Sequence, residues 1–93
     1  MTKFMIQPKC SPGKVLDVSG ARIDEGTNIH IWDFGQGIHQ YFKFKEAGDD
    51  YYFIEACHCS EKVLYVSCGK AQNGTNIQLW KKNYTDAQKF RII

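Results

Sequence analysis

Short apolar runs that alternate with polar residues fill the chain, and Gly, Pro, Asn and Asp separate them. Residues 14–19 place Leu16 and Val18 on one face and Asp17 on the other, the two-residue period of a half-buried strand. No apolar pattern of helical period extends over the length of a normal helix. The pattern predicts an all-β chain with eight strands, at residues 4–7, 14–19, 28–32, 40–45, 52–56, 63–67, 76–80 and 88–92.

The second four strands copy the first four. Residues 26–42 read GTNIHIWDFGQGIHQYF and residues 74–90 read GTNIQLWKKNYTDAQKF, a shift of 48 positions without a gap. Twelve of the 31 positions aligned between residues 14–44 and 62–92 are identical. A fixed period of about 20–50 residues is the signature of a repeat architecture. We therefore expect one domain, residues 1–93, made of a repeat at residues 1–46 and a repeat at residues 50–93.

Each copy ends its third strand in a tryptophan and begins its fourth strand with Gln-x-aromatic. These motifs, Gln40-Tyr41-Phe42 and Gln88-Lys89-Phe90, resemble the QxW motif of ricin B-type lectins, with Phe in place of Trp. The KVLDVSG stretch of residues 14–20 and the GTNI-x-aliphatic-Trp pattern are similar to common bacterial members of that family. The resemblance covers nearly the whole chain, twice. It implies β-trefoil repeats and a protein that binds sugars and catalyses no reaction.

A β-trefoil has three four-stranded repeats, whereas this chain has two. Phe42, Phe44, Phe90 and Ile92 of the fourth strands are expected in the core, but two repeats leave strand edges and apolar faces uncovered. Other copies of the chain can cover them, so we expect a homo-oligomer. A trimer is favoured because six repeats make two trefoils if one chain divides at a linker, residues 47–50. A dimer and a fragment that lacks its third repeat are the alternatives.

The resemblance also implies a sugar site in the first repeat. In ricin-type sites the acid comes from the second strand, the aromatic from the end of the third, and a polar side chain precedes the QxW strand. These roles fall on Asp17, Trp32 and His39, with Gln40 and His30 beside them. An aromatic ring packs on the C–H face of a sugar, and a carboxylate accepts strong hydrogen bonds from its hydroxyls. His39 replaces the Asn of strong galactose binders, but an imidazole can also donate or accept a hydrogen bond, so the resemblance still implies galactose-like or related sugars.

The second repeat departs from this pattern where the chemistry is needed. Tyr65 replaces the acid and Ala87 replaces the polar residue before the QxW strand, although Trp80 and Gln78 remain. We therefore expect one sugar site per chain. A protein–protein or assembly module that has lost sugar binding is an alternative function. A targeting domain of a larger toxin or glycoside hydrolase is another.

Composition argues against several other classes of protein. The net charge of +2 and the absence of long charge runs do not suggest a nucleic-acid partner. No stretch approaches the roughly 20 apolar residues of a membrane span, so we expect no membrane insertion. Lys3, Gln7 and Lys9 interrupt the N-terminal apolar run, so we expect no classical signal peptide. The location stays open between the cytoplasm and release without such a signal.

The four cysteines do not reproduce a disulfide in each repeat, because Cys10 aligns with His58. Reduced thiols are expected. Cys57-His58-Cys59 is spaced too tightly for zinc, whose paired cysteines usually have two to four residues between them. The sequence motifs of phosphate-binding loops, metalloproteases and serine hydrolases are also absent. We expect no metal, no cofactor and no enzyme activity.

Overall fold

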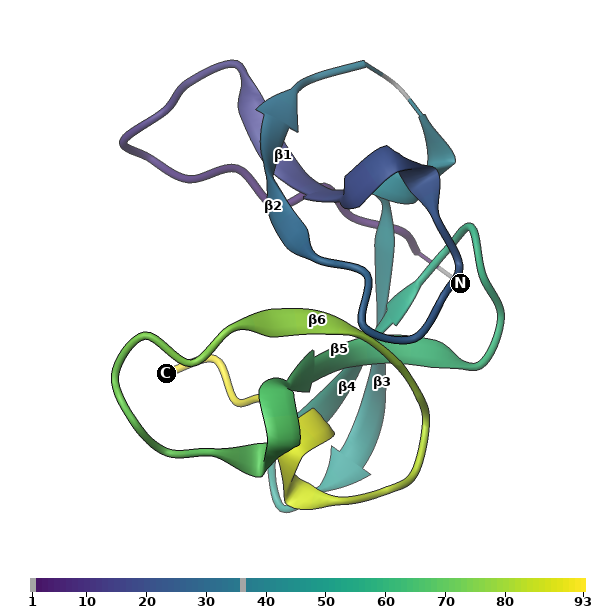
Figure 1. The fold of residues 1–93 in the computed structure, drawn as a ribbon, viewed down its shortest axis with the longest axis vertical. Coiled ribbons are helices and arrows are strands. Elements are labelled where there is room, and N and C mark those ends of the chain that lie inside the picture. The colour runs from purple at the N-terminus through teal and green to yellow at the C-terminus, as the bar shows by residue number, and fades with distance from the viewer. Residues whose placement is uncertain (1, 36) are drawn as a thin grey trace.

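The computed structural model describes residues 2–35 and 37–93, in which six strands form two antiparallel sheets (Figure 1). One sheet pairs β1 with β2, and the other joins β3 to β6 in chain order. The strands are β1 (Lys14–Val18), β2 (Ile29–Asp33), β3 (Phe42–Gly48), β4 (Tyr51–Ala56), β5 (Lys62–Val66) and β6 (Ile77–Lys81). The described helices are single 3-10 turns, at Ser19–Ala21, Ile38–Gln40, Ser67–Gly69 and Asp86–Gln88. The expected all-β class is confirmed.

The β1–β2 and β5–β6 hairpins have the same register. Val15 lies opposite Trp32 in the first hairpin, and Val63 lies opposite Trp80 in the second. The Ser19 amide donates to the Asn28 carbonyl at 2.9 Å in the first hairpin. The Ser67 amide donates to the Asn76 carbonyl at the same distance in the second. Residues that are 48 positions apart in the sequence therefore take equivalent places in the two hairpins.

The first and last predicted strands are shorter than expected. In residues 4–7 only Phe4 makes a bridge, to Phe42, and in residues 88–92 only Phe90 does, to Tyr52. Residues 4–7 lie between β3 and β1, because the Ile6 carbonyl also accepts a hydrogen bond from the Leu16 amide at 2.9 Å. Both segments therefore contribute isolated bridges and not continuous ladders.

The boundary between the repeats is a tight hairpin and not the linker expected at residues 47–50. Ala47 and Gly48 belong to β3, which pairs with β4 from Phe42↔Ala56 to Gly48↔Tyr51. Asp49 and Asp50 form the turn with φ angles of 53° and 68°. Positive φ at both central residues is the type I′ geometry that matches the twist of antiparallel strands. The two repeats are therefore joined by strand pairing.

The core lies where the first hairpin meets the four-stranded sheet. Its fully covered members include Val18, Phe42 and Leu79, and Phe44 and Phe90 pack against them partly buried. These positions confirm the expected core, with one correction. Ile92, predicted inside, is 76% exposed because, among the described residues, the pairing of this segment ends at the Phe90 bridge.

The loop before β2 connects the two hairpins through backbone hydrogen bonds. The Gly26 amide donates to the Leu79 carbonyl, and the Leu79 amide donates to the Thr27 carbonyl, each at 2.8 Å. Beside them, Nδ2 of Asn76 donates to Oδ1 of Asn28 at 2.7 Å. In Figure 1 this blue loop crosses the strand labelled β6. The first repeat thereby covers the outer edge of the second.

Candidate functional site

The β1–β2 hairpin carries three of the five predicted sugar-binding residues on one face. Asp17 of β1 lies directly opposite His30 of β2. Trp32 follows His30 by two residues, so it projects from the same face of the strand. The His30 and Trp32 rings stack with centroids 5.4 Å apart and planes at 22°. Trp32 is 59% exposed, so much of its indole surface is open to solvent.

The Asp17 carboxylate is the best-connected group of this face. His30 Nε2 donates to Oδ1 at 2.9 Å, and Gln40 Nε2 donates to Oδ2 at 2.9 Å. His39 Nε2 lies 3.1 Å from the same Oδ2. Asp17 is 2% exposed, and a charge at that depth requires such partners. Since each carboxylate oxygen can accept two hydrogen bonds, Oδ1, which has one donor, has the capacity to accept another.

Gln40 supports this site from behind. Its side chain is buried, donates to the Asp33 carbonyl at 2.9 Å and accepts from the Gly35 amide at 3.0 Å. These bonds fold the loop after β2 back over the hairpin. Gln88 does the same in the second repeat, donating to the Lys81 carbonyl and accepting from the Asn83 amide at 2.8 Å each. Gln40 therefore orients Asp17, and it does not line the hollow described next.

A hollow of about 350 Å³ opens over this face. Its walls include four of the predicted residues, Asp17, His30, Trp32 and His39. Ser19 and Gly20, from the 3-10 turn that follows β1, complete the lining. Neither was expected from the sequence. The one available signal was their position directly after the strand that carries Asp17.

Gly37 fixes the position of His39. A Cβ on Gly37 would lie 2.4 Å from Cε1 and 2.6 Å from Nδ1 of the His39 ring, far closer than atoms approach without displacement. The imidazole thus packs on the bare backbone of the residue two positions earlier, which directs Nε2 to Asp17. Glycine at this position has a packing reason within the site.

The second repeat builds a different surface at the equivalent position. Tyr65, which replaces the acid, stacks on Trp80 with centroids 5.1 Å apart and planes at 30°. Its phenol ring therefore covers one face of the Trp80 indole. Ala87 lies against the backbone of Gly69, 3.6 Å from where a Cβ would stand. This face carries neither the carboxylate nor the imidazole of the first repeat.

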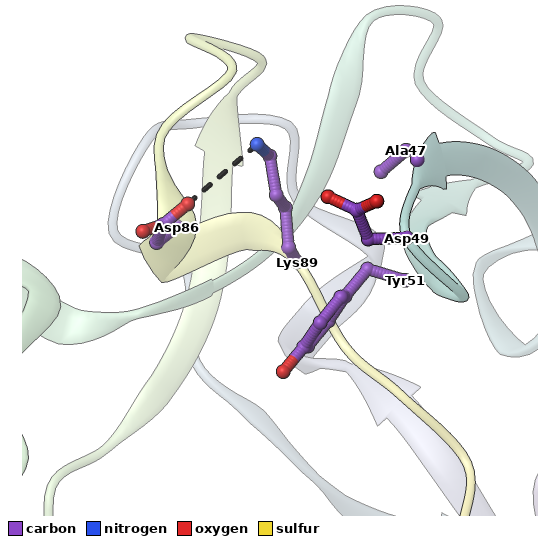
Figure 2. A pocket seen from close by; sticks show the side chains of 6 residues that line it. Ala47, Asp49, Tyr51, Asp86 and Lys89 are labelled. Carbon is purple, nitrogen blue, oxygen red and sulfur yellow. Dashed lines mark ion pairs between the residues drawn. The ribbon is translucent and has the colours of Figure 1, made fainter.

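A second hollow, of about 310 Å³, lies between the β3–β4 turn and the C-terminal segment (Figure 2). It is lined by Asp49, Tyr51, Asp86 and Lys89, and Figure 2 shows Lys89 directed between the two acids. Lys89 Nζ lies 3.6 Å from Oδ1 of Asp86. The Arg91 guanidinium lies 5.0 Å from the centre of the Tyr51 ring. Lys89 already pairs with Asp86, and Arg91 already lies against the Tyr51 ring. The acid and the aromatic ring that a sugar would need therefore have partners, so this hollow is a poorer match for a sugar.

Within the described ranges, no three His, Cys, Asp or Glu side chains converge as a metal site would require. The four cysteines there are unpaired thiols. His58 Nε2 donates to the Arg22 carbonyl at 2.9 Å. None of the helices in this part of the chain has the length and apolar character to cross a bilayer.

Comparison with known proteins gives a family and a fold. A family model described as ricin-type beta-trefoil lectin domain-like matches residues 2–80. The designed 3-fold symmetric protein ThreeFoil superposes with a TM-score of 0.79 at 24% identity, over 96% of this chain and 69% of that one. An exo-beta-1,3-galactanase from Clostridium thermocellum superposes with a TM-score of 0.80 at 23% identity, over 96% of this chain and 21% of the enzyme. At these identities the structural similarity establishes the fold. Among curated proteins, none matches the chain.

Proposed function

This chain belongs to the ricin-type beta-trefoil lectin domain-like family, and from that membership we propose that it is a non-catalytic lectin for galactose-like or related sugars. The observation that carries the proposal is the hollow in which the Asp17 carboxylate lies beside the exposed indole of Trp32. A sugar needs both an apolar surface for its C–H face and a charged acceptor for adjacent hydroxyls. The first repeat supplies both.

In the proposed complex, the apolar face of the sugar ring packs on Trp32. A hydroxyl donates to the remaining acceptor position on Asp17 Oδ1, while the His30 and His39 rings border the hydroxyls around it. Gln40 and the two histidines already hold the carboxylate in one orientation. A preorganised acceptor loses little conformational freedom when the sugar arrives, which favours binding.

One shallow site of this kind should bind weakly, with a Kd on the order of 1 mM, or about −4 kcal/mol. We therefore propose that the chain acts as a homo-oligomer, either a trimer or a dimer. Linked sites can raise avidity by about 10²–10⁴ on a multivalent glycan without any new contact. Weak binding at a single site is therefore a reason for the chain to assemble.

A glycan array tests the proposal with two matched acid substitutions. Wild-type protein should bind galactose-bearing glycans, and Asp17→Asn should lose that signal. Asp49→Asn, which removes an acid from the second hollow, should bind like the wild type. A wild-type protein that is folded but binds no glycan contradicts the lectin proposal. Loss with Asp49→Asn and retention with Asp17→Asn would move the site to the hollow of Figure 2.

A targeting domain within a longer enzyme or toxin is a second candidate. The observation that favours it is the galactanase, where a fold similar to this chain occupies about a fifth of the polypeptide. The sugar site would then deliver attached activity to a glycan. The reading frame that encodes this chain decides the matter: a catalytic or toxin domain joined to it supports targeting.

An assembly module without sugar binding is the third candidate. It is favoured by the depth of Asp17, whose three side-chain partners leave only a small part of the carboxylate accessible. In that case the same polar cluster stabilises the hairpin alone. The two functions separate on the array, because a pure assembly module oligomerises and gives no glycan signal.

A further inference from the structure

Two equivalent residues of the repeats have opposite exposure. Leu79 in β6 is completely buried, whereas Ile31, 48 positions earlier in β2, is 41% exposed. Both lie at the centre of their hairpins, opposite Leu64 and Leu16 respectively. The difference has one visible cause. The loop of residues 26–28 covers the edge of β6, and in the described part of the chain no equivalent loop reaches β2.

The edge of β2 is ready for the same pairing. The Leu16 amide donates to Ile6, away from β2, so Leu16 and Ile31 form a pair without mutual hydrogen bonds. The amide and carbonyl of Ile31 therefore point outward, as those of Leu79 do toward Gly26 and Thr27. No other segment of the described residues bonds to them. An exposed apolar strand with outward backbone groups is a template for another chain.

The matching loop exists in the second repeat. Residues 74–76 repeat the Gly-Thr-Asn of residues 26–28, and both glycines have positive φ, 91° at Gly26 and 86° at Gly74. Thr27 Oγ1 donates to the Asp24 carbonyl at 2.7 Å, and Thr75 Oγ1 donates to the Gln72 carbonyl at 2.8 Å. The two loops thus have the same internal bonds. Thr27 is buried by its contact with β6, while Thr75 is only partly covered.

We infer that the loop of residues 74–76 in one copy of the chain pairs with the β2 edge of a second copy. The Gly74 amide would donate to the Ile31 carbonyl, and the Ile31 amide would donate to the Thr75 carbonyl. Ile31 would be buried as Leu79 is. Lys62 Nζ donates to the Ile23 carbonyl in the internal contact, so Lys14 of the second copy would reach the Ala71 carbonyl. The internal contact between the repeats is the template for every one of these pairs.

A second copy is the occupant because the receiving edge and the preformed loop belong to the same sequence. They also lie on different repeats, and the paired β3 and β4 strands hold those repeats together. The contact is therefore head-to-tail, with the second repeat of one chain on the first repeat of the next. Contacts of this type extend from copy to copy until a ring closes.

The same contact would complete the sugar hollow. In the internal template, a Cβ on Gly26 would lie 3.8 Å from Gln78 Oε1 and 4.0 Å from the Trp80 ring. The equivalents of these two residues are His30 and Trp32, so Gly74 of the first copy would border the hollow over Asp17 of the second copy. This last step rests on the proposed lectin function, whereas the pairing itself does not.

Light scattering of the purified chain tests the pairing. Wild-type protein should have the mass of two or more chains of 10.7 kDa, and the Ile31→Asp variant should have the mass of one chain. Phe34→Asp is the control, because Phe34 is similarly exposed at 47% and lies outside the proposed contact. A wild-type mass of 10.7 kDa at every concentration overturns the inference, as does an Ile31→Asp variant that keeps the wild-type mass.

Amide hydrogen exchange provides a test that needs no substitution. The Ile31 amide of the wild type should be protected like the Leu79 amide at concentrations where the chains associate. It should exchange quickly after dilution to single chains, while the Leu79 amide stays protected. An Ile31 amide that exchanges quickly in the assembled protein overturns this pairing, even if light scattering gives the mass of several chains. If the protein binds no glycan on the array, the lectin proposal is contradicted, and the pairing between copies is not.

Discussion

The carboxylate of Asp17 accepts a hydrogen bond from His30 at 2.9 Å across the β1–β2 pair, and His30 stacks on Trp32. The residue that would accept sugar hydroxyls is thus linked through one imidazole to the residue that would carry the sugar ring. In the second hairpin, the corresponding positions hold Tyr65 and Gln78, and no carboxylate enters. Two hairpins of the same register therefore differ in whether a carboxylate and an imidazole face each other across the strands.

Asp17→Asn should weaken sugar binding and destabilise the fold together. The amide of Asn has no charge, and a lost charge-assisted hydrogen bond of about 1.5–3 kcal/mol lowers affinity roughly tenfold or more. The Asn side chain also has one acceptor oxygen in place of two, so it cannot accept from His30, His39 and Gln40 as Asp17 does. The free energy of unfolding should therefore fall by about 1–3 kcal/mol. NMR titration with galactose and urea denaturation measure the two effects.

Asp33→Asn is the control for that experiment. Asp33 pairs with Lys14 at 2.6 Å, but both side chains are substantially exposed, so the pair contributes at most about 1 kcal/mol. Galactose affinity and stability should both stay near those of the wild type. If both variants keep the wild-type galactose affinity, Asp17 makes no contact with the sugar and the assigned site is wrong.

Gln40→Met and Gln88→Met should separate support of the fold from support of the site. Each substitution leaves one backbone amide and one carbonyl of its loop without the buried partner, which costs about 1–3 kcal/mol of unfolding free energy. The stability loss should therefore be similar in both variants. Only Gln40→Met also releases the Asp17 carboxylate, so only this variant should lose galactose affinity in a titration. Equal losses of affinity would show that Gln40 supports the fold alone.

The alternation of residues 14–19 and 28–32 was sufficient to predict β1, β2 and the shared face of His30 and Trp32. The 48-residue repeat then predicted the second hairpin, because identical patterns adopt the same register. His39 came from the family resemblance, and its ring indeed lies against Asp17. The alternation was informative for Asp17, His30 and Trp32 because strand geometry fixes the direction of their side chains, whereas His39 lies on a 3-10 turn that alternation does not describe.

The remaining features depend on contacts that no local pattern contains. Ile92 has the same alternation as Phe44 and lies outside the core, since burial requires a neighbouring strand that residues 2–35 and 37–93 do not supply. The turn at Asp49 and Asp50 uses two acids with positive φ in place of the usual glycine, so it resembled a linker. Ser19 and Gly20 line the hollow only because the 3-10 turn directs the chain back over the hairpin.

Gly37→Ala should disturb the site while the fold remains intact. The new methyl group would overlap the His39 ring, which must rotate away from Asp17 because a surface imidazole moves more readily than the backbone. We expect galactose affinity to fall by about threefold to tenfold, a loss of roughly 1 kcal/mol. The His39 ring signals in an NMR spectrum should shift in the free protein.

Gly35→Ala is the matched control two residues earlier. A Cβ there would meet only the Asp33 carbonyl oxygen, at an ordinary 3.8 Å. Galactose affinity and the His39 signals should therefore stay at their wild-type values. Should Gly37→Ala bind as well as Gly35→Ala, His39 does not contribute to recognition, and Asp17 with Trp32 must account for it.

The two tryptophans should report sugar binding differently. Trp32 is open to solvent, whereas Trp80 is stacked under Tyr65, so a sugar can change the surroundings of Trp32 only. Galactose should shift the fluorescence of a Trp80→Phe variant, which retains Trp32, and leave Trp32→Phe unchanged. Removal of Trp32 should cost little stability because its ring is 59% exposed, while Trp80→Ala should cost about 1–3 kcal/mol through lost packing. A sugar-dependent signal in Trp32→Phe would place a ligand on the second repeat and contradict the assignment of one site to the hairpin that carries Asp17.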